Sequence, residues 1–162
     1  MLYYMSITKL EEDVSMQQFN DQKGERRLLS IANMQVKDAE SYYRQYNGLE
    51  KMERLQKIKN LKERIKKNKK NPKLYEWILA IKSKDKNVVG KIEVLSKGNG
   101  IAFLTISIPK EDWLYKYGIE AIDQFIKICK ENEYFSTIEL DEDNWIVERY
   151  REIYDSDLII NL

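Results

Sequence analysis

Few residue types are available for catalysis in this chain, because its 162 residues include no histidine and a single cysteine. A Ser-His-Asp triad, a Cys-His pair, an imidazole base and a zinc site built from histidine and cysteine are therefore excluded. Proton transfer must use carboxylate, tyrosine, lysine, cysteine or bound water. Cys129 lies on the apolar face of a helix predicted over residues 116–131, so we expect this thiol to be buried and inert.

The stretch WLYKYGIEAIDQFIKICKEN, residues 113–132, follows a β-rich run, GIAFLTISIP, and has the form of a strand-to-helix turn. Backbone N–H groups at the start of a helix lack partners and can bind a pyrophosphate, and glycine lets the phosphates approach. Bulky residues precede Gly118, however. The pattern leaves two alternatives, a phosphate-binding turn or a helix whose small residues pack on the sheet.

Charge is distributed unevenly, although the net charge is only +1. Residues 51–73 hold eleven Lys and Arg against Glu53 and Glu63, whereas residues 131–157 hold ten Asp and Glu against Arg149 and Arg151. The two segments could neutralise each other within the fold. The lysine-rich segment also admits nucleic-acid binding, for which the alternative is a solvated outer helix face. The acidic run 141–155 lacks the glycine of a calcium loop, so we predict no metal site.

Hydrophobic periodicity predicts a mixed α/β order of elements. Strands are expected at 26–34, 75–83, 87–95, 101–109 and 136–140, with closing strand DLIINL at the C-terminus, and a short strand is plausible at 1–10. Residues 11–25 read as a linker or short helix. Helices are expected from Asp38 to Asn47-Gly48, over 51–70, 116–131 and 143–155. The helix at 51–70 carries an apolar stripe formed by Met52, Leu55, Ile58, Leu61 and Ile65.

These elements predict an α+β fold: a mixed, mostly antiparallel sheet with helices on both faces and one parallel β-α-β unit joining strands 101–109 and 136–140. The length suits one domain, which we place at 26–162 after an N-terminal extension, 1–25, that could add a strand. The apolar runs are shorter than a membrane span, and the first residues do not resemble a secretory signal. With one cysteine, the composition indicates a cytoplasmic protein.

Several short motifs occur along this order of elements. They are Arg27-Leu28-Leu29 with Val36-Lys37-Asp38-Ala39-Glu40, Trp77 with Val89-Gly90-Lys91-Ile92, the group Trp113, Tyr117, Gly118, Glu120 and Ala121, and finally Asn144 with Tyr150. Together they resemble the Gcn5-related N-acetyltransferase (GNAT) superfamily, and most closely its branch that acetylates the N-termini of ribosomal proteins. The resemblance extends from about Arg26 to Tyr154.

The resemblance implies an N-acetyltransferase that uses acetyl-CoA as co-substrate and needs no metal. The pantetheine arm would lie against the backbone of Ile106, Ser107 and Ile108, and free amides at 115–119 would receive the diphosphate. Tyr150 would be the general acid, and Glu93 stands nearest as a base. The remaining cofactor contacts would come from Trp113, Lys116, Tyr117, Gly118, Ile119 and Asn144.

Departures from the motif leave the function open. Leu114 and Lys116 occupy positions where the family has glycine, and the chain stops early for the closing hairpin. Three hypotheses follow: transfer of an acetyl group to an unidentified small-molecule or peptide amine, a GNAT-fold binding or regulatory protein without turnover, and a nucleic-acid binder using helix 51–70. The acceptor would lie between residues 37–70 and the C-terminal end. The chain could also form a homodimer.

Overall fold

The computed structural model describes residues 19, 21, 29–71 and 76–162. The strand expected at 1–10 and the proposed boundary between residues 25 and 26 lie outside the described residues. Of the segment 11–25, Phe19 and Asp21 are described, and neither lies in a helix or strand.

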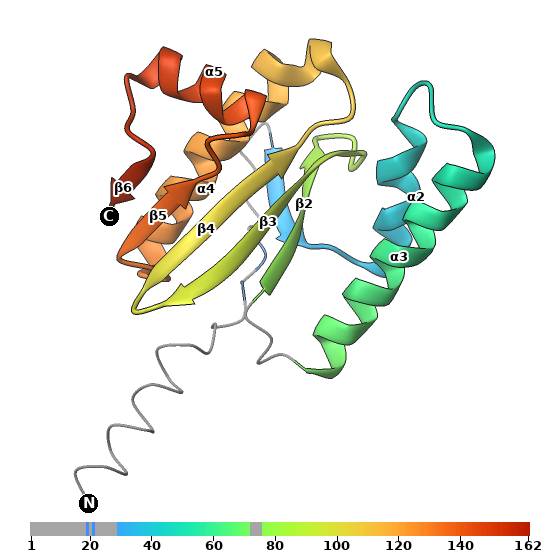
Figure 1. Cartoon of the computed structure of the whole chain (residues 1–162), viewed down its shortest axis with the longest axis horizontal. Helices are drawn as coiled ribbons and strands as arrows, with labels where there is room; N and C mark the ends of the chain where they lie inside the picture. The colour runs from blue at the N-terminus through green and yellow to red at the C-terminus, as the bar shows by residue number, and fades with distance from the viewer. Residues whose placement is uncertain (1–18, 20, 22–28, 72–75) are drawn as a thin grey trace, which may run out of the picture.

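A six-stranded sheet forms the centre of the fold (Figure 1). Its strands lie side by side in chain order, and every neighbouring pair is antiparallel except β4 and β5. This confirms the predicted mixed sheet with one parallel pair. The strands are β1 (Leu29–Asn33), β2 (Glu76–Ser83), β3 (Val88–Gly98), β4 (Ile101–Ser107), β5 (Thr137–Leu140) and β6 (Ile159–Asn161).

Helices cover both faces of the sheet, as predicted. The described helices are α2 (Val36–Arg44), α3 (Lys51–Lys70), α4 (Ile119–Asn132) and α5 (Trp145–Tyr154). Successive strand side chains point to opposite faces, so Leu79 and Ile81 of β2 join the core under α4 and α5. Ile78 and Ala80, the residues that alternate with them along β2, point to the other face and pack with α2 and α3. β2 is thus buried on both faces.

The segment between β4 and α4 is wound rather than open. A 3₁₀ turn at Glu111–Trp113 runs into a π-helical turn at Leu114–Gly118, and α4 begins at Ile119, three residues later than predicted. From there the apolar face of α4 follows the expected pattern, with Ala121, Ile122, Phe125 and Cys129 fully buried.

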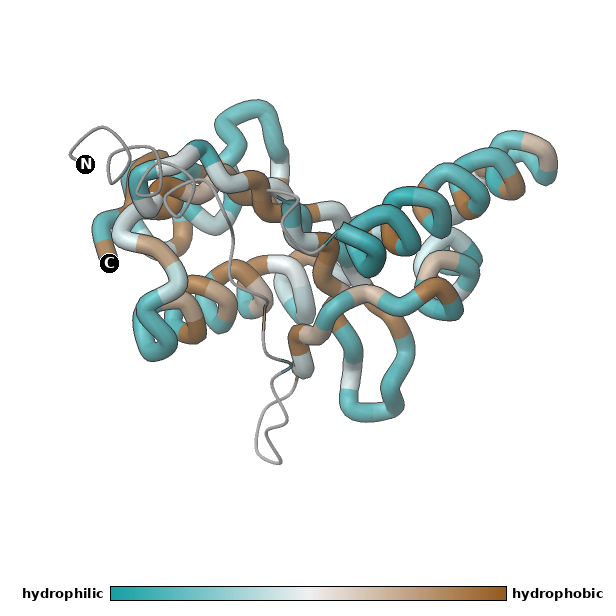
Figure 2. The backbone as a smooth tube through the Cα atoms, turned by 90° about the horizontal axis from the view of Figure 1, so that it is seen from below, coloured by the Kyte–Doolittle hydropathy of each residue, from teal (hydrophilic) through white to brown (hydrophobic). Residues whose placement is uncertain are grey.

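The apolar stripe predicted for α3 is wrong in its N-terminal half. Leu61 and Ile65 are buried, but Met52 and Leu55 are 75% and 53% exposed. Figure 2 shows the reason: α3 extends well beyond the sheet, so its first turns have no sheet surface to cover. In the part of the chain that the structure describes, no helix is long and apolar enough to cross a membrane.

The start of α2 also differs from the prediction. Gln35 rather than Asp38 is the N-cap residue, and Asp38 lies in the first turn with its carboxylate accepting the Gln35 backbone N–H at 2.8 Å. The Lys82 ammonium of β2 lies 3.4 Å from the buried Asp38 carboxylate. Asp38 therefore joins α2 to the sheet as well as marking where the helix begins.

Two leucines of α3 provide a matched test of this packing. We expect Leu61→Ala to lower the free energy of unfolding by about 2–5 kcal/mol, because it leaves a cavity in the core. Leu55→Ala, on the same helix but 53% exposed, should change it by less than about 0.5 kcal/mol. Urea denaturation of both variants measures the difference; equal losses would contradict the described placement of α3.

Candidate active site

The end of β4 is the feature that could hold an acyl carrier. The parallel ladder between β4 and β5 ends at Leu104 and Leu140, with one further bond from the Asp141 N–H to the Leu104 carbonyl at 3.0 Å. β4 continues to Ser107, whereas the chain after β5 turns away into α5. Beyond Leu104, the edge of β4 that faces β5 is therefore no longer covered by a neighbouring strand, while the opposite edge stays paired with β3 as far as Ser107.

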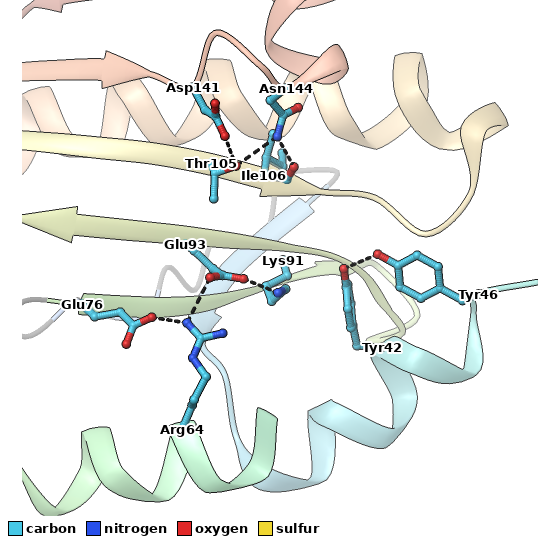
Figure 3. Close-up of polar contacts among 10 residues, drawn as sticks. All are labelled: Tyr42, Tyr46, Arg64, Glu76, Lys91, Glu93, Thr105, Ile106, Asp141 and Asn144. Carbon is cyan, nitrogen blue, oxygen red and sulfur yellow. Dashed lines mark hydrogen bonds and ion pairs between the residues drawn. The ribbon is translucent and has the colours of Figure 1, made fainter. Parts of the chain in front are cut away.

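Asn144 bridges this gap (Figure 3). Its side-chain amide donates to the Ile106 carbonyl at 2.6 Å and to the Thr105 hydroxyl at 3.1 Å, while its oxygen accepts the Ile146 N–H at 2.9 Å. The Thr105 hydroxyl in turn donates to the Asp141 carboxylate at 3.0 Å. Asn144 thus caps α5 and occupies the backbone acceptor that a pantetheine amide would use.

Backbone alternation along β4 separates the three residues predicted to face the arm. The carbonyls of Leu104 and Ile106 both point toward the β5 side, so the backbone groups of Ser107 point toward β3, where its partner is Lys91. Ile106 has the orientation that the pantetheine hypothesis requires, and Ile108 lies one residue beyond the end of β4. Ser107 instead borders a cavity on the other side of β4.

The turn before α4 is less open than predicted. The expectation of free amides throughout residues 115–119 is wrong for Ile119, whose N–H donates to the Leu114 carbonyl. The Lys116 ammonium lies 5.1 Å from the Tyr117 ring centroid, and Trp113 contacts Tyr117 edge-on. Lys116 can still reach a phosphate by leaving this ring, which is a weak contact at an exposed site.

Gly118 has a structural use in this turn. A Cβ atom there would lie 3.2 Å from Ile146 and 3.3 Å from Ile108, tighter than ordinary van der Waals contact. The small residue thus lets the start of α4 approach both the end of β4 and the first turn of α5. Its presence is explained by packing, and a role in phosphate binding stays a prediction.

Glu93, the predicted base, lies in a network of charges under α3 (Figure 3). Its carboxylate pairs with Lys91 and, at 3.0 Å, with Arg64, and Arg64 also pairs with Glu76. Burial alone would raise the pKa of Glu93, but Lys91 and Arg64 together outweigh burial and lower it. A carboxylate held by two cations is a poor proton acceptor. The arrangement favours Glu93 as a positioning group for Lys91.

Tyr150, the predicted acid, is packed on the α4 side of α5. Its ring lies 4.8 Å from that of Tyr154, and its side chain belongs to the core under α4 and α5. Burial first, and then the negative charge of Asp123, raise the pKa of Tyr150 to about 12. The phenol is thus protonated at neutral pH, as an acid must be, and its side chain belongs to the same buried cluster as Leu104 and Ile106 of β4.

A cluster of tyrosines forms the second half of the candidate site. Tyr42 and Tyr43 of α2 and Tyr46, two residues after its end, line a cavity of about 300 Å³ together with Leu49, Glu53, Lys57, Lys91 and Ser107. We call it the tyrosine pocket. The ring centroids lie 4.9–5.7 Å apart, and the hydroxyls of Tyr42 and Tyr46 are 2.6 Å apart. The signal for this pocket in the sequence is the spacing YYxxY, which brings three rings together at the end of a helix.

Cys129 behaves as predicted. It is fully buried, and burial raises the pKa of its thiol to about 12. Among the described residues, no group of three or more His, Cys, Asp or Glu is placed to hold a metal ion.

No protein-family model and no curated protein matches this chain. Solved structures do match, and they define the fold as that of the GNAT acetyltransferases. A chimera of the spermidine N-acetyltransferase SpeG from Vibrio cholerae and hSSAT has a TM-score of 0.61 and 16% identity, over 78% of this chain and 79% of that one. A candidate ribosomal-protein-serine acetyltransferase from Vibrio cholerae has a TM-score of 0.60 and 18% identity, over 85% and 83%.

A third similar structure is RimJ of Mycobacterium smegmatis in complex with CoA-disulfide, with a TM-score of 0.59 and 11% identity over 76% of this chain and 68% of that one. At such identities the likeness concerns the fold. The predicted resemblance to the GNAT superfamily is thereby confirmed at the level of architecture.

The charge network makes a testable prediction about pH. Because the pKa of Glu93 is lowered in the folded state, its stabilisation is present above the unfolded value of 4.5 and is lost as the pH falls through the folded value. We expect Glu93→Gln to lower the free energy of unfolding by about 1.5–3 kcal/mol at pH 7, with the difference shrinking below pH 4.5.

Urea titrations of both proteins between pH 3 and 7 measure this difference. Glu63→Gln, which removes an exposed carboxylate of α3, serves as the control and should change little. A difference between wild type and Glu93→Gln that does not vary with pH would contradict the described ion pairs.

Proposed function

We propose that this protein is an N-acyltransferase that moves an acetyl group from acetyl-CoA to a small amine. The observation that carries the proposal is the junction at Ser107: the uncovered edge of β4 at Ile106 lies on one side of the strand, and the tyrosine pocket lies on the other. A carrier arm against Ile106 and an amine in the pocket would meet there. The similar structures, which are acetyltransferases, support the reaction class.

The chemistry requires a neutral amine and a polarised carbonyl. The amine nitrogen attacks the thioester carbonyl carbon, the carbon–sulfur bond breaks, the nitrogen loses a proton and the leaving thiolate gains one. Backbone N–H groups at the end of β4 are the candidates for stabilising the oxyanion. Since Glu93 is paired with two cations, bound water is the better proton acceptor. Tyr150 stays the predicted proton donor, with a pKa raised to about 12.

A pantetheine arm would have to displace Asn144. The Asn144 amide now donates to the Ile106 carbonyl, so an incoming amide must share or replace that bond. The exchange conserves the hydrogen bond, since one amide donor substitutes for another. Lys116 and Lys110 flank the turn and could attract the phosphates, although Glu111 and Asp112 beside them oppose it.

A second candidate is a GNAT-fold protein that binds CoA or a related molecule without turnover. Two observations favour it. Glu93 is held by two cations, and Tyr150 is largely buried with a pKa raised to about 12 by that burial and by the charge of Asp123. With no histidine in the chain and Glu93 held by two cations, an active enzyme would need bound water or another carboxylate as its base. Binding and turnover must therefore be measured separately.

We expect acetyl-CoA to bind the full-length protein and raise its melting temperature. At a concentration one hundred times the dissociation constant, binding stabilises the folded state by about 2.7 kcal/mol. We expect Lys116→Glu to weaken binding of CoA by about tenfold, because it replaces a cation beside the phosphates with an anion, and to leave pantetheine binding unchanged. Isothermal titration calorimetry measures both ligands.

Lys66→Glu, an equal charge change on the exposed face of α3, is the matched control and should bind CoA like the wild type. Absence of any shift at millimolar acetyl-CoA would contradict the acyltransferase proposal. Binding without thiol release, across a panel of primary amines at pH 7–9, would favour the second candidate.

A further inference from the structure

The strand β6 is an edge of the sheet with free backbone groups. It is the last strand in the sheet order and lies at the border of the molecule in Figure 1. The Leu158 carbonyl accepts an N–H of β5 at 2.8 Å, and the Leu162 N–H donates to the residue before β5 at 2.9 Å. Because strand backbone groups alternate in direction, the N–H and C=O groups of Ile159 and Asn161 point away from β5. Among the described residues, none bonds these four groups.

The opposite edge of the sheet, β1, is closed by side chains. The Gln124 amide donates to the Leu29 carbonyl at 3.1 Å, and the Asp21 carboxylate accepts the Asn33 N–H at 2.8 Å. β6 has no such contacts in the described part of the chain, and its three residues include neither a charge nor a proline, which commonly keep an edge strand from pairing. The edge of β6 therefore favours the addition of a strand.

One face of β6 is also open. Leu158, Ile160 and Leu162 pack against the core under α4 and α5, whereas Ile159 is 54% exposed on the opposite face, next to Glu139 of β5. A strand added at this edge would cover the Ile159 side chain and bond the outward backbone groups at the same time.

The described part of the N-terminal segment lies at the end of the sheet where β6 ends. The Phe19 ring is fully buried, with its centroid 5.3 Å from that of Trp77 at the start of β2 and 5.8 Å from that of Tyr134. Tyr134 precedes the first residue of β5 by three positions, and that end of β5 pairs with Asn161. The chain before Phe19 therefore starts near the last residue of β6.

The chain before Phe19 is long enough to reach this edge. From β2 to β6 there are four strand spacings, which is about 19 Å. Residues 11–18 span about 26 Å when extended, so residues 2–10 can lie beside β6. Their sequence, LYYMSITKL, is rich in Tyr, Ile and Thr, which favour strands. A segment that arrives from this end of the sheet would run parallel to β6.

The covalent connection favours this segment over a second copy of the chain. A stable interface between two proteins buries about 1,200–2,000 Å², far more than a strand of three residues offers. A tethered segment needs no such area, because the linker holds it near the edge at a high effective concentration.

We propose that residues 2–10 add to the open edge of β6 as a further strand of the sheet, bonded to the outward backbone groups of Ile159 and Asn161. The inference does not rest on the proposed acyltransferase function, since it uses only the backbone of β6 and the anchor at Phe19.

Amide hydrogen exchange of the full-length protein, followed by NMR, measures this pairing residue by residue. We expect the Ile159 and Asn161 amides to exchange about tenfold more slowly than in a variant that lacks residues 1–10. The Ile160 amide, which faces β5, should change little and is the internal control. Unprotected Ile159 and Asn161 amides in the full-length protein would overturn the proposal. Protection that survives the deletion would also overturn it, and would assign the edge to a second copy if it increases with protein concentration.

The variant Ile159→Pro tests the same contact in the full-length chain. It removes an outward N–H that β5 does not use, and proline is tolerated at such positions of an edge strand. We expect the Asn161 amide to exchange about tenfold faster and trypsin to cleave after Lys9 about fivefold faster, whereas Ile159→Val, which keeps the amide, should behave like the wild type. Unchanged cleavage after Lys9 in Ile159→Pro would sink the assignment, and this result decides it if the deletion variant does not fold.

Discussion

The short parallel pair between β4 and β5 is the constraint on which the rest of the site depends. Its ladder ends at Leu104, and the exposed continuation of β4 is tied to the start of α5 by the amide of Asn144. That one side chain caps a helix, satisfies a strand carbonyl and sets where α5 begins. The close approach of α4 at Gly118, between Ile108 and Ile146, follows from the same geometry.

β4 contributes residues to both halves of the candidate site because successive residues of a strand point in opposite directions. The Ile106 backbone faces the gap next to β5, while Ser107, one residue later, borders the tyrosine pocket on the opposite side. A site assembled across one strand needs no long loop. It does require that the helices α2 and α3 be held at a fixed distance from the sheet. The ion pairs of Arg64 with Glu76 and Glu93 attach α3 to the sheet, and the pair of Asp38 with Lys82 attaches α2.

The basic and acidic segments do not neutralise each other in the described ion pairs. Lys62 and Arg64 of α3 pair with Glu40, Glu76 and Glu93, whereas Glu139 pairs with Lys97 and Glu152 with Arg149. Lys62, Arg64 and also Arg54, which donates to the Tyr46 carbonyl, thus help to hold α3 in place, and Figure 2 shows α3 as a mostly hydrophilic helix. These contacts account for part of the charge on α3, and nucleic-acid binding by this helix stays an untested alternative.

Local patterns by themselves determined the order of elements, the parallel β-α-β unit, the buried face of α4 and the inert Cys129, because hydrophobic period and turn residues act over a few positions. Only the tertiary structure decided what Glu93 and Tyr42 contact, since their partners lie on other elements: Arg64 is 29 residues away from Glu93 in the chain. The exposure of Leu55 and the bridge from Asn144 to Ile106, 38 residues apart, likewise depend on how far a helix extends past a sheet and where a strand pair ends. Such distances are set by packing between elements, which no local pattern encodes.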